Sequence, residues 1–182
     1  MFENWMVEDF DRDDIEGEIH VGLDFGYVND PTAVVYSIMD KKHKRIYIYA
    51  EEGGKEWTND KIYEIMKISM YTNANPNSII YADAAEPKSI KYLQAKGLLI
   101  KPAKKGKDSI LKGIDYLSQF KIIIHSNCSE IIDELNQYTW IEKDGEPINT
   151  PINKFNHWID ALRYSYSVEA SGSSKLSFSR MK

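Results

Sequence analysis

Three aspartates occupy positions where the surrounding sequence is apolar. Asp24 ends an apolar run, Asp83 follows the apolar segment 79–82, and Asp160 lies within the stretch 158–162. Placing carboxylates among apolar side chains costs free energy, and carboxylates that share a site raise one another's pKa. A divalent cation removes this conflict, because oxygen-rich carboxylate sites suit Mg2+ or Mn2+. Two such ions could activate a water and stabilise the leaving oxygen in phosphodiester hydrolysis.

Two neighbouring residues could assist the aspartates. His157 precedes Asp160 by three positions, so both would share one helix face and could bind the same ion. Glu86 follows Asp83 by three positions and could support a metal-bound water, although acids are also common in a first helical turn. The alternative is purely structural. Asp24 would form a turn, Asp83 would cap a helix, Asp160 would be solvent-exposed, and His157 would cap or pack against a hairpin.

A basic tract adds a possible nucleic-acid surface. Residues 96–112 contain six lysines and one aspartate, whereas residues 1–18 contain eight acids and one arginine. The net charge of −5 therefore arises from the N-terminal segment, and the rest of the chain is mildly basic. A basic tract can bind a polyanion or simply form a solvated loop. The candidates for contacts with the DNA backbone are Lys101, Lys104, Lys105 and Lys107.

The elements that must position these residues alternate between strands and helices. β-rich runs at 20–24, 33–39 and 45–50 are joined by short turns and predict three consecutive antiparallel strands. Helix–strand units follow, then a hairpin at 140–155 and a closing helix at 156–168. This order predicts an α/β fold, a mixed sheet in which later strands lie parallel to the first and helices cover both faces. If the strands that end at Asp24 and Asp83 are neighbours, both aspartates emerge at the same sheet edge, and a helix packed across that edge would add Asp160.

Composition limits the remaining choices. The 182 residues, 42% of them hydrophobic, suit one globular domain. The longest apolar run, 46–50, is far too short for a transmembrane helix, and no signal peptide is expected. Cys128 is the single cysteine, which excludes intrachain disulfides and cysteine-based zinc sites and fits a reducing compartment.

The segments around the three aspartates resemble a known family. Segments 22–33, 81–89 and 156–164 are similar, in this order, to the acidic motifs of the nuclease domain of tailed-phage large terminases, and the resemblance spans residues 19–168. It implies a ribonuclease H-like fold in which Asp24, Asp83 and Asp160 bind Mg2+ or Mn2+, two ions in number, with His157 as an added ligand. The implied activity is endonucleolytic cleavage of concatemeric double-stranded DNA during genome packaging, with the hairpin as an insertion near the DNA groove.

The resemblance also implies partners. No G-x-x-x-x-G-K-[ST] phosphate loop is found, so we expect an excised C-terminal domain whose ATPase domain lies upstream in the full-length protein. Residues 1–18 would be an acidic linker or arm and residues 169–182 a flexible tail. Portal and small terminase subunit would be further partners, in the host cell cytoplasm and without a membrane. Two alternatives stay open: a ribonuclease H-like junction resolvase, and a non-catalytic module that binds DNA or docks onto a packaging motor.

Overall fold

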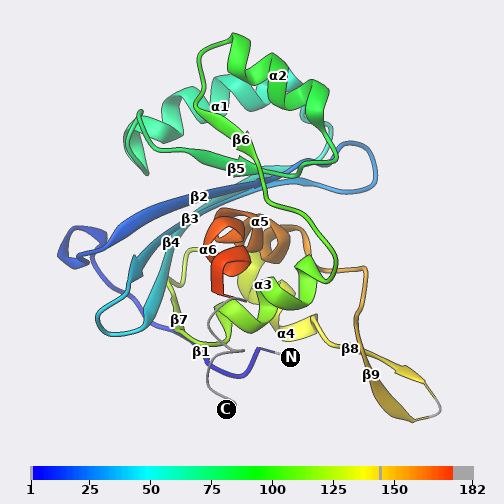
Figure 1. The fold of residues 1–182 in the computed structure, drawn as a ribbon. Helices are drawn as coiled ribbons and strands as arrows, with labels where there is room; N and C mark the ends of the chain where they lie inside the picture. The colour runs from blue at the N-terminus through cyan, green and yellow to red at the C-terminus, as the bar shows by residue number, and fades with distance from the viewer. Residues whose placement is uncertain (1, 144, 174–182) are drawn as a thin grey trace.

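The centre of the fold is an antiparallel meander. A computed structural model describes residues 2–143 and 145–173, and its first long strands are β2 (Glu18–Asp24), β3 (Thr32–Asp40) and β4 (Arg45–Gly54) (Figure 1). The short connections fix the antiparallel pairing. Residues 20–24 of β2 are all buried, as expected for a central strand covered on both faces. The predicted meander is confirmed.

Parallel strands extend the meander on both sides. They are β5 (Ile80–Ala82) and β6 (Ile100–Pro102) beyond β2, and β7 (Lys121–Ile124) and β1 (Trp5–Val7) beyond β4. All four pairings are parallel, and the order across the described sheet is β1-β7-β4-β3-β2-β5-β6. The prediction that later strands run parallel to the first is therefore confirmed.

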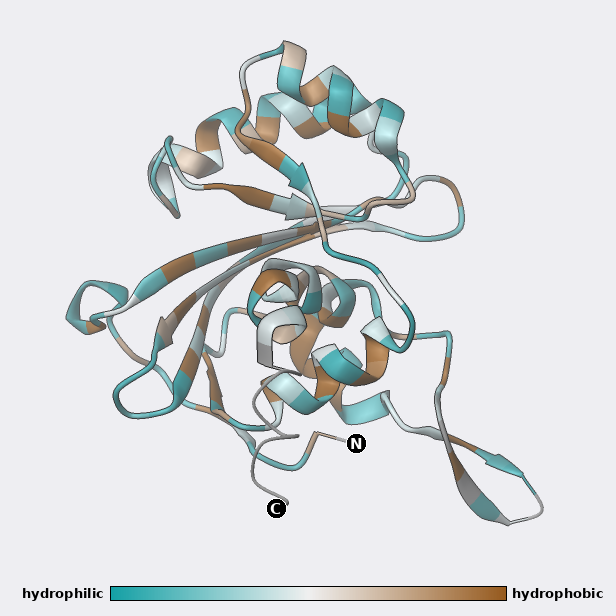
Figure 2. Cartoon of the chain, in the orientation of Figure 1, coloured by the Kyte–Doolittle hydropathy of each residue, from teal (hydrophilic) through white to brown (hydrophobic). Residues whose placement is uncertain are grey.

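Helices cover both faces of the sheet (Figure 1). On one face lie α1 (Asn59–Thr72) and α2 (Pro87–Ala95), and on the other lie α3 (Ser109–Leu117), α4 (Ser129–Gln137), α5 (His157–Ser165) and α6 (Ser167–Ser173). Two apolar cores follow, one on each face of the sheet. Figure 2 shows hydrophobic residues on the strands and alternating with polar residues around the helices. The closing helix predicted at 156–168 is divided at Tyr166, where the backbone leaves helical geometry.

The acidic segment 1–18 departs from the linker or arm that was expected. Strand β1 pairs with the edge of β7, a 3-10 helix spans Arg12–Asp14, and Glu18 already belongs to β2. Phe2 is buried in the core and stacks on Tyr138, with ring centroids 6.4 Å apart. The apolar residues scattered between the acids explain this packing. Phe2 enters the core, Trp5, Phe10 and Ile15 pack against a core, and the acids face solvent.

The hairpin and the C-terminal segment complete the description. Strands β8 (Trp140–Lys143) and β9 (Glu146–Pro151) pair as the predicted hairpin and project from the body (Figure 1). Of the predicted turn, residue 144 lies outside the described residues. The tail expected from 169 begins as part of α6, and residues 174–182 are likewise outside the described part. None of the described helices is both long and apolar enough to cross a membrane.

Candidate active site

Two of the predicted aspartates lie at one edge of the sheet because their strands are parallel neighbours. Leu23 of β2 is the register partner of Ala82 of β5. Asp24 follows Leu23 and Asp83 follows Ala82, so the two aspartates lie side by side at the ends of these strands. The Asp83 backbone N–H also donates to the Leu23 carbonyl oxygen at 3.1 Å. Asp24 is buried, with 8% of its surface exposed.

Helix α5 brings the third aspartate to the same edge by packing directly onto β2. Gly22 makes this possible, because a Cβ at this position would overlap the carbonyl oxygen of Ala161. The backbone of α5 therefore approaches the strand more closely than any side chain would allow. Asp160, one residue before Ala161, then lies with Asp24 and Asp83 in the wall of one cleft of about 680 Å3.

His157 links the first aspartate to the helix. Its Nδ1 lies 3.3 Å from Asp24 Oδ2, and its Nε2 lies 3.4 Å from Asp30 Oδ1. The hydrogen bond to Asp24 raises the pKa of His157, against the opposing effect of partial burial. Burial raises the pKa of Asp24 to about 6; His157 opposes this rise, and the charges of Asp160 and Asp83 add to it. The three aspartates are thus electrostatically coupled, as a shared cation site requires.

Basic side chains neutralise the other two aspartates. The Nε and Nη2 atoms of Arg163 both donate to Asp160 Oδ1, at 3.1 and 2.7 Å, while Asn156 Nδ2 donates to Oδ2 at 3.2 Å. Lys105 forms an ion pair with Asp83. As placed, no group of three His, Cys, Asp or Glu side chains within the described ranges is close enough to hold a metal ion. The donor set nevertheless fits a divalent cation in kind, since carboxylate oxygens and an imidazole converge at an edge where positive charge already compensates them.

A buried glutamate fixes the start of α5. Glu134 on α4 accepts the backbone N–H groups of His157 and Ile159 at 2.7 and 2.9 Å. Burial raises the pKa of Glu134 to about 7, although these hydrogen bonds oppose the rise. Because the side chain of Asn156 does not cap α5, Glu134 satisfies the free N–H groups of the first turn. It therefore sets the orientation of His157 and Asp160 relative to the sheet.

The remaining predicted residues separate into two groups. Lys104, Lys105 and Lys107 line a pocket next to the aspartates, whereas Lys101 is exposed on β6 and lines neither that pocket nor the cleft. Glu86 is exposed, accepts a hydrogen bond from Ser89 and lines a different groove, so the structure does not bring it together with the three aspartates.

Four residues of this site were missed from sequence alone: Asp30, Glu134, Asn156 and Arg163. Arg163 had a readable signal, because it follows Asp160 by three positions and so lies on the same helix face. Glu134 also had one, since it falls on the apolar side of an amphipathic helix. Asp30 and Asn156 lie in connecting segments, and only the folded chain brings them to His157 and Asp160.

The sheet order and the three aspartates at its edge define a ribonuclease H-like α/β domain. The sequence model of the terminase RNase H-like domain family matches residues 24–168, and the chain belongs to this family. The predicted resemblance is thereby confirmed, as is the predicted fold class.

Individual relatives agree with this assignment. The large terminase subunit of Bacillus phage SPP1 is 32% identical over 176 residues, covering 91% of this chain and 40% of the relative. The PBSX phage terminase large subunit of Bacillus subtilis strain 168 is 32% identical over 146 residues, covering 79% and 33%. The chain thus spans well under half the length of these curated relatives. The crystal structure of the SPP1 large terminase nuclease domain with bound Mn superposes with a TM-score of 0.82 at 30% identity, covering 92% of this chain and 98% of that one.

Proposed function

We propose that this domain is a metal-dependent endonuclease that cleaves concatemeric double-stranded DNA during phage genome packaging. The observation that carries the proposal is the convergence of Asp24, Asp83 and Asp160 on one cleft at the end of β2 and β5. Family membership supports it, as does the Mn bound in the structure of the SPP1 relative. We further propose that an ATPase domain of the same protein, a portal and a small terminase subunit are partners, in the host cell cytoplasm.

The three aspartates, with His157 as an added ligand, would hold Mg2+ or Mn2+, two ions in number. Such ions supply activation of the attacking water and charge stabilisation at the leaving 3′ oxygen. The chain's own residues prepare the site. His157 Nδ1 donates to Asp24 Oδ2 and so orients that carboxylate, and Arg163 fixes Asp160 through two N–H donors on one oxygen. Phosphate contacts carry no base information, so cleavage should be weakly sequence-selective.

Plasmid cleavage tests the proposal. Wild type, Asp160→Asn and the control Asp115→Asn, an exposed aspartate on α3 outside the cleft, are incubated with Mn2+, Mg2+ or EDTA. We expect nicking and linearisation by wild type and the control in metal only, and a loss of more than about 100-fold in Asp160→Asn. Circular dichroism verifies that the variant folds.

Three results would count against this function. Cutting that survives Asp160→Asn would remove the aspartate from the site. A strong preference for branched over linear DNA would favour a junction resolvase. Metal-independent DNA binding without any cleavage would favour a non-catalytic binding or docking module.

A further inference from the structure

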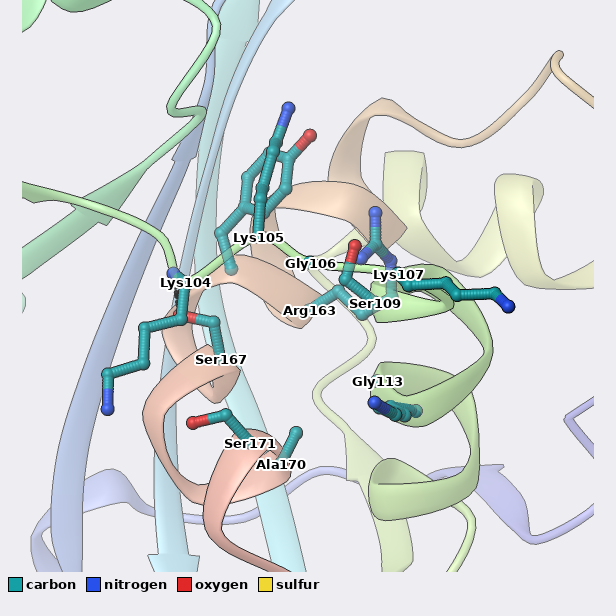
Figure 3. A pocket seen from close by; sticks show the side chains of 12 residues that line it. Lys104, Lys105, Gly106, Lys107, Ser109, Gly113, Arg163, Ser167, Ala170 and Ser171 are labelled. Atoms are coloured by element: carbon teal, nitrogen blue, oxygen red, sulfur yellow. Dashed lines mark hydrogen bonds between the residues drawn. The ribbon is translucent and has the colours of Figure 1, made fainter. Parts of the chain in front are cut away.

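A second, smaller pocket lies directly beside the acidic cleft (Figure 3). Its walls come from the loop after β6, the first turns of α3, the end of α5 and α6, and its volume is about 240 Å3. A water molecule takes about 30 Å3 in the liquid, so the pocket has room for a considerably larger group. Tyr164 and the loop-borne Lys105 separate it from the cleft: Tyr164 lines both spaces, and Lys105 lines the pocket while pairing with Asp83.

Positive charge dominates the pocket. Five cationic side chains line it, namely Lys104, Lys105, Lys107, Lys112 and Arg163, and no carboxylate does. Lys105 and Arg163 are already paired with Asp83 and Asp160. In the part of the chain that the structure describes, the other three lysines form no ion pair. Lys104 and Lys107 leave the loop in opposite directions (Figure 3). Uncompensated ammonium groups around a concave surface attract an anion.

The pocket is held in a fixed position relative to the aspartates. The Ala103 N–H donates to the carbonyl oxygen of Ala82, the residue before Asp83, at 2.7 Å. The next N–H, of Lys104, donates to Ser167 Oγ on α6 at 3.0 Å. At the other end of the loop, the Ser109 N–H donates to the Gly106 carbonyl oxygen at 3.1 Å. The loop is therefore tied both to the strand that carries Asp83 and to the helical layer that carries Asp160.

We propose that this pocket binds a backbone phosphate of the DNA strand, adjacent to the phosphate that is cleaved. The proposal rests on the proposed nuclease function and gives the DNA backbone a second binding point beside the acidic cleft. A phosphodiester group matches the pocket in charge, because ammonium groups and serine hydroxyls donate hydrogen bonds to its oxygens. Tyr164 lines both spaces and Lys105 pairs with Asp83, so a phosphate bound in the pocket lies next to the cleft and the same strand can occupy both.

The test measures the salt dependence of DNA binding, which does not require cleavage. Binding of a fluorescently labelled duplex is followed by anisotropy in EDTA at several KCl concentrations, for wild type and for Lys107→Gln/Lys112→Gln. Both lysines are exposed, so the core stays intact. Each lost phosphate contact lowers the slope of log affinity against log salt by about 0.9. The charge-matched control Lys42→Gln/Lys67→Gln, on a distant turn and on α1, should keep the wild-type slope.

The outcomes separate this proposal from the function on which it rests. If wild type cleaves plasmid but the pocket variant keeps the wild-type slope, the pocket proposal is overturned and the nuclease stands. If wild type neither binds nor cleaves DNA, both are overturned. A titration with thymidine 5′-monophosphate addresses the other source of a phosphate. Mononucleotide binding that is lost in the pocket variant, with an unchanged duplex slope, would reassign the pocket to a free nucleotide.

Discussion

Asp24 occupies an unfavourable place for a carboxylate, and its neighbours reduce the cost only in part. Burial holds its pKa near 6, while the hydrogen bond with His157 acts in the opposite direction and raises the pKa of the histidine. Asp83 and Asp160 are compensated differently, each by one basic side chain. This compensating positive charge allows several carboxylates to share one cleft.

Gly113 leaves room for the Arg163 side chain, which reaches Asp160. A Cβ at Gly113 would lie 2.5 Å from Cγ and 2.7 Å from Cδ of Arg163, which is itself only 6% exposed. In an ordinary helix, replacing glycine by alanine stabilises by about 1 kcal/mol. We expect Gly113→Ala to reverse this sign and to lower the free energy of unfolding by about 1–2 kcal/mol, because the buried side chain must move. Urea unfolding measures the change.

The control for this prediction is Gly106→Ala. A Cβ at Gly106 meets nothing within 4 Å, and its backbone has no positive φ. The control should therefore be close to neutral. If Gly113→Ala instead stabilises the protein by about 1 kcal/mol, as helix propensity alone predicts, then Arg163 can move aside without cost and the prediction is wrong.

Among the elements, α4 and α5 are fastened at their N-termini by carboxylates from other elements. Neither Cys128 nor Asn156, at the start of each helix, caps it with its side chain. Glu51 of β4 instead accepts the N–H groups of Glu130 and Ile131, at 2.7 and 3.0 Å. Glu134 of α4 does the same for α5. The sheet thus positions α4, and α4 positions the helix that carries His157 and Asp160.

The Glu51 contact predicts a pH dependence of stability. Burial raises the pKa of Glu51 to about 7 from its ordinary value of 4.5. Between these values the folded state binds a proton that the unfolded state has released, so the contribution of Glu51 is present at low pH and is lost as the pH rises through about 7. Relative to Glu51→Gln, wild type should lose roughly 1 kcal/mol of unfolding free energy between pH 6 and pH 8, after allowance for partial exposure.

Urea unfolding of wild type and Glu51→Gln at pH 6 and pH 8 measures how much more unfolding free energy wild type loses than the variant. The variant retains an amide oxygen that can accept one N–H group but cannot titrate. A wild-type protein that gains stability relative to the variant on going from pH 6 to pH 8 would mean that the backbone hydrogen bonds outweigh burial at Glu51.

At the scale of the whole molecule, local signals predicted the meander and the directions of the later strands, but neither the full strand order nor the pairing of charges. Turn residues and apolar runs were enough to predict the meander and the parallel strands, because each depends on neighbours in sequence or on connection rules. The shared edge of Asp24 and Asp83 was predicted only on the condition that their strands are neighbours, which the structure confirms. The pairing of Lys105 with Asp83 joins residues from separate loops, and the packing of Gly22 against Ala161 joins β2 to α5. Such contacts arise only when the chain is folded, and sequence reasoning had no means to reach them.

The N-terminal segment gives the sharpest test at this scale, because its acidic composition concealed its role in the core. Strand β1 covers the edge of β7, and Asn4 Nδ2 donates to the Phe120 carbonyl oxygen at 3.1 Å. Deletion of residues 2–8 should expose that edge and leave a cavity where Phe2 packs, so we expect a loss of at least about 3 kcal/mol of unfolding free energy. Phe2→Ala alone should account for most of it, and Glu3→Gln, at an exposed position, for none. If the deletion variant and wild type have equal denaturation midpoints, the segment acts as a linker. If the deletion variant loses much of its unfolding free energy, the folding unit includes β1.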